Sequence, residues 1–268
     1  MPAPDWTLLL RTPAFEVTAL VVGLIVGSFA NVCIYRLPRG GSVVTPPSRC
    51  PACGARVAAY DNVPVLSFLL LGGRCRACRA PISWRYPTVE AANGLLWLGL
   101  AARRGPELQT LVGAVLVSAL LVLSLIDLEH QILPDVITLP GIALGLATAF
   151  LPGAPVRPLA AAAAAAGGWI GFAAVATAYR RLRGIEGLGQ GDWKMAAFLG
   201  AFLGWQKMLL TVLIASVAGT IVGLVLVALR GGDLRHALPL GTFLGAAGIA
   251  VVFFGDWLLV WYRGLFGG

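Results

Sequence analysis

Residues 111–135 read LVGAVLVSALLVLSLIDLEHQILPD, an apolar run that ends abruptly at an aspartate. The hydrocarbon core of a bilayer is about 30 Å thick, so a helix needs around 20 apolar residues to cross it. This run is continuous and does not alternate, which favours a helix over a barrel strand. The whole chain of 268 residues is 58% hydrophobic and 12% charged, whereas soluble domains carry roughly 25% charge. The sequence therefore predicts an all-α polytopic membrane protein.

Other apolar runs resemble this one, and together they predict about eight transmembrane helices. The expected ranges are 15–36, 88–102, 108–126, 132–151, 158–179, 194–204, 206–229 and 239–262. Prolines mark many of their ends, as expected of residues that break helices. The first run is too long for a signal peptide and follows a polar, acid-containing leader, so we expect it to stay in place. The alanine run at 161–166 is expected to be a helix-packing surface.

Basic residues are divided unequally between the loops on the two sides of these helices. One side holds 14 of the lysines and arginines and the other holds 6. Cytoplasmic loops are enriched in basic residues, so the richer side is predicted to be cytoplasmic and both termini external. The Arg103–Arg104 pair lies on the poorer side and departs from this rule. The net charge of +8 thus indicates topology and contact with lipid rather than a nucleic acid partner.

Four of the five cysteines form two C-x-x-C pairs, CPAC at 50–53 and CRAC at 75–78. This spacing predicts a structural zinc site with four thiolate ligands, Cys50, Cys53, Cys75 and Cys78. A redox pair or four unligated thiols are the alternatives, and a reducing compartment disfavours disulfides. The polar segment 38–87 is therefore predicted to be a small cytoplasmic zinc-knuckle domain. It separates a first transmembrane helix (1–37) from a membrane core (88–268).

Two aspartates, Asp127 and Asp192, stand at the predicted cytoplasmic ends of apolar runs. An acid at membrane depth is costly, so it is a candidate functional residue. Helix capping is the alternative, and it fits Asp192, which precedes a run. It does not fit Asp127, because the C-terminal end of a helix carries a negative partial charge. For Asp192 alone, capping and function explain the residue equally well, whereas the pair favours function.

Two adjacent carboxylates share a proton, and such a pair supports acid–base hydrolysis of a peptide bond without a covalent intermediate. Asp192, at a helix start, is predicted to be the ionised member of the pair. Gly189 and Gly191 would let an extended peptide backbone approach, or would form a flexible hinge. Lys194 would either influence the field at the site or face lipid headgroups.

Four segments together resemble the type IV prepilin leader peptidases, membrane aspartic proteases of the GxGD kind. They are GSFANVCIYRLP (27–38), the cysteine-containing stretch 50–90, IDLEHQILPD (126–135) and EGLGQGDWK (186–194). The resemblance implies a multi-pass enzyme of the bacterial cytoplasmic membrane whose active site faces the cytoplasm. It implies that Asp127 and Asp192 are catalytic. Leu188 and Gly73 are small departures from the usual family pattern.

The resemblance also implies two reactions. The enzyme would cut the basic leader of type IV prepilins, or of type II secretion pseudopilins, just after a glycine. It would then methylate the new N-terminal amine with S-adenosylmethionine, a step associated with the four-cysteine loop. Asn31 and Arg36 are assigned to the methyl donor only because they lie near that loop.

Further acids surround the predicted pair. Asp135 and Glu186 are expected to support the site, and Glu186 and Glu129 would attract the basic leader or would be ordinary headgroup-region residues. Two other functions remain open from the residues alone. A proton-coupled transporter would place its acids near the membrane midplane, often in repeated halves. A zinc-stabilised membrane scaffold would account for the cysteines and give Asp127 no purpose.

Overall fold

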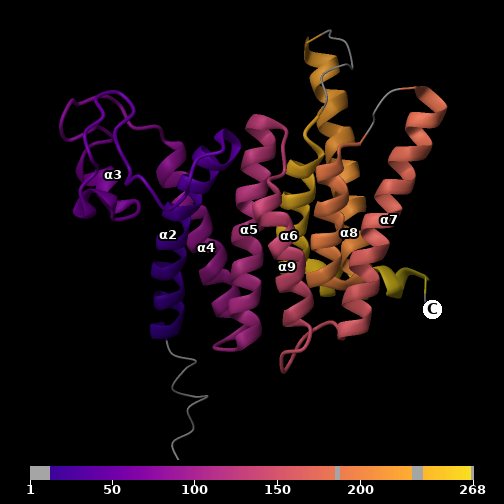
Figure 1. Cartoon of the computed structure of the whole chain (residues 1–268). Helices are drawn as coiled ribbons and strands as arrows, with labels where there is room; N and C mark the ends of the chain where they lie inside the picture. Colours follow the sequence, from indigo (N-terminus) through magenta and orange to yellow (C-terminus); the bar gives the residue numbers. More distant parts are fainter. Residues whose placement is uncertain (1–12, 185–187, 231–237, 267–268) are drawn as a thin grey trace, which may run out of the picture. The chain divides into compact units, whose positions relative to one another are not determined.

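The structure is a computed structural model that describes residues 13–184, 188–230 and 238–266. Its helices in those ranges are α2 (Pro13–Arg36), η1 (Leu37–Arg39), η2 (Ala59–Asn62), α3 (Leu66–Leu70), α4 (Arg85–Arg104), α5 (Leu108–His130), α6 (Asp135–Thr148), α7 (Pro158–Arg183), α8 (Gln190–Arg230) and α9 (Leu240–Phe266) (Figure 1). The chain divides into two compact units, Met1–Ser118 and Ala119–Gly268, and α5 contributes to both.

Five helices in the described ranges are long and apolar enough to cross a membrane, namely α2, α5, α7, α8 and α9. Helix α6 is apolar but shorter, and α4 has 20 residues with polar groups in its first turns. Each of the eight apolar runs identified in the sequence falls on one of these seven helices, with two of the runs on α8. The all-α polytopic class is therefore confirmed.

Helix α8 is two helical segments joined at Gly204, where the backbone has φ 73° and ψ 174°. Gly191 in its first turn approaches Leu133, and its last turns approach Leu238, just before α9. Gly204, between them, approaches Val156 in the α6–α7 connection. The two halves of α8 are therefore antiparallel and meet at Gly204, as the separate runs 194–204 and 206–229 predicted.

The first half of α8 packs closely against α7. Ala161, Ala164 and Ala165 are buried, so the expected packing role of the alanine run is confirmed. A Cβ atom on Gly200 would lie only 2.5 Å from the carbonyl oxygen of Ala164, so the two backbones are in direct contact. Small side chains at such contacts let membrane helices approach and gain dispersion energy. This contact fixes the part of α8 that carries Asp192.

Candidate active site and metal centre

Asp127 lies in the last turn of α5 and is only 5% exposed. One of its carboxylate oxygens, Oδ2, accepts the backbone N–H of Thr242 at 2.7 Å. The Thr242 hydroxyl lies 3.3 Å from the same oxygen and 3.1 Å from the carbonyl oxygen of Ser124. A Cβ atom on Gly241 would come within 2.9 Å of the carboxylate. The first turn of α9 therefore encloses Asp127 and fixes its orientation.

Asp192 lies in the first turn of α8. Its carboxylate oxygen Oδ2 accepts the N–H of Gly189 at 3.0 Å, and its own N–H donates to the carbonyl oxygen of Gly189 at 3.1 Å. This reciprocal pair satisfies backbone groups that a helix start leaves open. Asp192 thus has a local structural role at the helix start, but as a residue inside the first turn that binds the Gly189 N–H and not as the N-cap of the alternative; the same bond orients its carboxylate.

The segments that carry the two aspartates both pack against one residue, Leu133. Leu133, which follows α5, lies 3.1 Å from a Cβ built on Gly191 and 3.0 Å from one built on Gly241. Leu133 is therefore packed between the residue before Asp192 and the glycine that touches Asp127. The predicted meeting of two acids that are distant in sequence is consistent with this geometry.

Lys194 and Asp135, two further residues of the predicted site, form an ion pair with 2.5 Å between Nζ and Oδ1. The pair links the first turn of α8 to the first residue of α6. Lys194 thus has a carboxylate partner on the protein. The two predicted roles of Lys194, influence on the field at the site and contact with lipid headgroups, had not included this ion pair. Glu186 lies outside the residues that the structure describes.

The four cysteines Cys50, Cys53, Cys75 and Cys78 lie together, with all sulfur atoms within 4.8 Å of one another. A tetrahedral zinc ion with bonds of about 2.3 Å would place its sulfur ligands about 3.8 Å apart. The Sγ atoms of Cys50 and Cys78 are 3.8 Å apart. Backbone N–H groups of Cys53 and then Ala52 lower the pKa of Cys50 to about 7. The residues therefore fit a four-thiolate metal ion.

The two cysteine turns have the same hydrogen bonds, displaced by 25 residues. Cys50 N–H donates to Ala55 and Gly54 N–H donates to Cys50, while Cys75 N–H donates to Ala80 and Arg79 N–H donates to Cys75. Isolated β-bridges join 49 to 56 and 74 to 81 in the same relation. The backbone thus forms two matching turns, each of which presents a C-x-x-C pair to one point.

Comparison with known proteins shows the family to which the chain belongs. Residues 21–104 match the family described as the bacterial peptidase A24 N-terminal domain, and residues 114–224 match the type IV leader peptidase family. A protein named "Prepilin leader peptidase/N-methyltransferase" from Pseudomonas putida is 42% identical, over 94% of this chain and 95% of its own. The chain belongs to the type IV leader peptidase family.

Other members of the family with the same name are similar to this chain over most of its length. The protein from Burkholderia pseudomallei is 42% identical over 88% of this chain and 84% of its own, and that from Myxococcus xanthus is 43% identical over 82% and 65%. No solved structure matches the chain significantly.

Thr242 is a site residue that the sequence analysis missed. It lies in PLGT, residues 239–242, where proline and glycine mark the start of the last apolar run. The last apolar run starts at the end of the bundle where Asp127 was expected. The first N–H groups of a helix have no partner within the helix, so they could have been predicted to bind the Asp127 carboxylate. Asp127 and Asp192 thus both have a helix N-terminus beside them. The prediction that Asp192 carries the negative charge considered only the N-terminus of α8 and not the backbone N–H of Thr242 in α9. It therefore stays a prediction.

Asn31 and Arg36 have structural contacts in the first unit. The amide of Asn31 donates to the carbonyl oxygen of Tyr86 at 3.0 Å, and Arg36 donates to that of Ser42 at 3.0 Å. Asn31 also has a buried side-chain oxygen without a partner among the described residues. These contacts join α2 to α4 and to the cysteine loop. Their assignment to the methyl donor stays a prediction.

Proposed function

We propose that this chain is an aspartic endopeptidase of the bacterial inner membrane that removes the leader of prepilins. Asp127 and Asp192 are the catalytic pair of this enzyme. The observation that carries the proposal is the contact of Leu133 with both aspartate-bearing segments, which brings a buried acid of α5 next to the first turn of α8. Membership of the family supplies the class of reaction.

The pair catalyses hydrolysis by moving protons between water and the peptide. The ionised aspartate takes a proton from a water molecule as the oxygen attacks the scissile carbonyl carbon, and the protonated aspartate donates to the carbonyl oxygen. The tetrahedral intermediate then breaks its C–N bond, and the leaving amine takes a proton from the pair. No bond forms between the protein and the substrate. The α9 amide at Thr242 holds Asp127 in position throughout.

The substrate enters as an apolar helix in the same bilayer, with its basic leader in the cytoplasm. The aspartates lie at helix ends, so the cut occurs where the leader leaves the membrane. Gly189 and Gly191 leave room for an extended backbone beside Asp192. A Cβ on Gly189 would meet little other than Asp192 itself, 3.6 Å away. Type II secretion pseudopilins have the same chemistry and belong to the same substrate class.

The second reaction methylates the amine that the cut releases. S-adenosylmethionine would be the methyl donor: the amine nitrogen would attack the methyl carbon, the sulfonium S–CH₃ bond would break with S-adenosylhomocysteine as the leaving group, and the nitrogen would lose a proton. The four cysteines would hold a structural zinc ion, and the ion would fix the two turns of the loop associated with this step. The closed set of four thiolates gives the metal no position for a reacting group.

The proteolytic assignment is tested by incubating the purified protein with a prepilin and measuring cleavage. Asp127→Asn and Asp192→Asn should each abolish cleavage, because either change removes one partner of the proton exchange. Asp256→Asn is the matched control, since Asp256 lies further along α9 and pairs with Lys207 at 2.8 Å. Normal cleavage by either of the first two variants would contradict the catalytic pair.

A proton-coupled transporter is disfavoured by the position of the acids at helix ends and by membership of a peptidase family. A scaffold without chemistry gives no reason for the enclosed Asp127.

A further inference from the structure

Glu90 is a buried acid far in sequence from the aspartate pair, and it joins α4 to the cysteine loop. It is 8% exposed, and its Oε2 accepts the N–H of Val65 at 2.7 Å. Val65 directly precedes α3 and has φ 61° and ψ −49°. A β-branched residue rarely adopts a positive φ, so the surrounding structure must hold this conformation. The bond to Glu90 is one contact that holds it.

Glu90 lies in α4, and its neighbour on α2 shows how far along α2 this contact is. A Cβ atom on Gly27 would lie 2.8 Å from the Cα atom of Glu90, so the two residues are at the same level. Gly27 precedes the end of α2 at Arg36 by about 13 Å, given a rise of about 1.5 Å per residue. Because α2 is one of the apolar spans, the backbone of Glu90 lies level with the interior of a helix long enough to cross a membrane, and the Glu90 side chain reaches from there to Val65. A backbone N–H at such a depth needs a protein acceptor, which Glu90 provides.

Helix α3 presents apolar side chains to its surroundings at this level. Leu70 is 78% exposed, and Trp84, whose ring packs on α3, is 71% exposed. The Trp84 ring packs on Phe68 with 4.7 Å between centroids. The exposed apolar residues of this surface, hereafter the α3 surface, are Leu66, Leu69, Leu70 and Trp84. Leucines with a tryptophan are typical of segments that lie in the interface of a bilayer.

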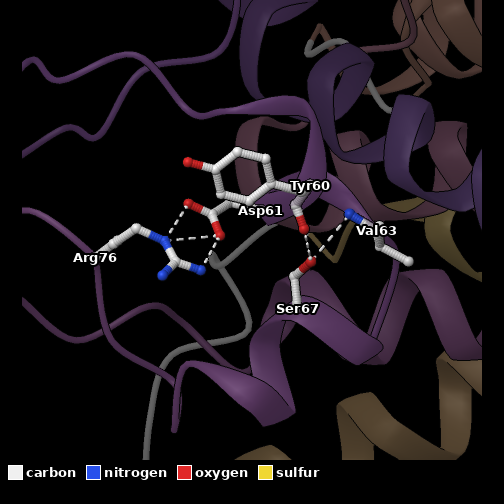
Figure 2. A network of polar contacts seen from close by, with 5 residues as sticks. All are labelled: Tyr60, Asp61, Val63, Ser67 and Arg76. Atoms are coloured by element: carbon white, nitrogen blue, oxygen red, sulfur yellow. Dashed lines mark hydrogen bonds and ion pairs between the residues drawn. The ribbon is translucent and has the colours of Figure 1, made fainter.

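Polar contacts fix α3 to the metal-binding turns (Figure 2). The Ser67 hydroxyl donates to the carbonyl oxygen of Tyr60 at 2.9 Å and accepts the N–H of Val63 at 3.0 Å. Arg76, between Cys75 and Cys78, donates to both oxygens of Asp61 at 2.6 to 3.0 Å. Whatever holds α3 therefore also positions the second cysteine pair.

The charge of the loop agrees with a lipid partner. Segment 38–87 has one acid, Asp61, against seven arginines, which are Arg39, Arg49, Arg56, Arg74, Arg76, Arg79 and Arg85. Basic residues beside a membrane span are attracted to anionic headgroups.

We propose that the α3 surface docks the four-cysteine module into the lipid interface, with Glu90 as the positioning residue that holds α3 there. The partner is the bilayer itself. The module is thereby kept at the surface where α2 and α4 enter the membrane. This inference does not depend on the peptidase activity.

The test uses the full-length protein in nanodiscs whose lipids carry bromine on their acyl chains. The emission of Trp84 is obtained by subtracting the tryptophan emission of the Trp84→Phe variant from that of the wild type. Bromine should quench most of this emission, and iodide in the water should leave it largely unchanged. Quenching by iodide alone would show a water-facing module and overturn the proposal. Emission quenched by neither would show a protein cover and would also overturn it.

Two pairs of variants test whether the quenching of Trp84 depends on α3 and on Glu90. Leu70→Asp should make Trp84 accessible to iodide, whereas Val44→Asp should not, although Val44 is 82% exposed on the same loop. Glu90→Gln keeps an acceptor for Val65 and should retain bromine quenching, whereas Glu90→Leu should lose it and raise deuterium exchange at residues 63–71. Unchanged bromine quenching in Leu70→Asp would contradict docking through α3.

Discussion

At the residue scale, the candidate site depends on how one carboxylate is held. Asp127 accepts a backbone N–H from another helix, and its position is fixed by Thr242 rather than by its own neighbours in sequence. Asp192 is held by a contact three residues away. The first acid is therefore oriented by tertiary structure and the second by local structure.

The Thr242 hydroxyl should contribute to catalysis separately from the Thr242 backbone. Thr242→Val keeps the shape and the N–H but removes the group that lies near both Asp127 and the Ser124 carbonyl oxygen. Loss of a hydrogen bond of this kind should lower kcat for prepilin cleavage roughly ten-fold. Thr211→Val is the control, because the Thr211 hydroxyl donates within its own helix to Lys207. An equal loss in both variants would mean a general packing effect.

The Asp61–Arg76 pair should give the cysteine loop a dependence on pH. Hydrogen bonds from Arg76 lower the pKa of Asp61 below its usual value. The favourable contribution is therefore complete above the ordinary aspartate pKa and is lost as the pH falls through the lowered value. Arg76→Gln should move the Asp61 titration to higher pH, as measured by NMR of ¹³C-labelled aspartate with Asp61→Asn for assignment. An unchanged titration would mean that the ion pair does not form in solution.

At the scale of elements, the break in α8 decides where Asp192 lies. A straight helix of 41 residues would extend beyond the bilayer and would place its two ends at opposite sides. The turn at Gly204 instead returns the second half to the same end, next to the start of α9. The first half is short, and its contact with the alanines of α7 holds it in place.

Gly204→Ala should therefore destabilise the second unit. A side chain at φ 73° costs roughly 1–2 kcal/mol, and the new Cβ would lie 3.2 Å from Val156. The midpoint of thermal unfolding and the rate of cleavage should both fall. Gly167→Ala, in the interior of α7 with open space around it, should be neutral or slightly stabilising. Equal stability of the two variants would argue against the turn.

At the scale of the whole molecule, the two units carry the two sets of functional residues. The cysteines lie in the unit Met1–Ser118, and the aspartates lie in the unit Ala119–Gly268. The two matched family domains, at 21–104 and 114–224, follow nearly the same division. Proteolysis and the metal site should therefore be separable by mutation.

Removal of the metal should affect methylation and leave proteolysis intact. Cys50→Ser should lower the zinc content measured by mass spectrometry, because the remaining three thiolates bind more weakly. Methyl transfer from labelled S-adenosylmethionine should fall with it, while prepilin cleavage persists. Cys33→Ser, which changes the buried cysteine outside the cluster, should keep the zinc. Loss of cleavage together with the zinc would contradict the separation.

The amino-acid sequence by itself determined the membrane class, and it predicted the four metal ligands and the aspartate pair. These depend on local quantities, namely the length of apolar runs, the spacing of cysteines in tight turns and the cost of an acid at a helix end. It also predicted the break near residue 205, because it divided this part of the chain into the runs 194–204 and 206–229.

Only the tertiary structure decided which groups surround those residues. The contact of Thr242 with Asp127, of Lys194 with Asp135 and of Glu90 with Val65 joins residues that are 25 to 115 positions apart. A hydrogen bond between distant residues depends on how helices pack, and packing depends on summed contacts of small side chains that no short motif records. The sequence therefore predicted the reacting groups, whereas the packing of α5, α8 and α9 set their geometry.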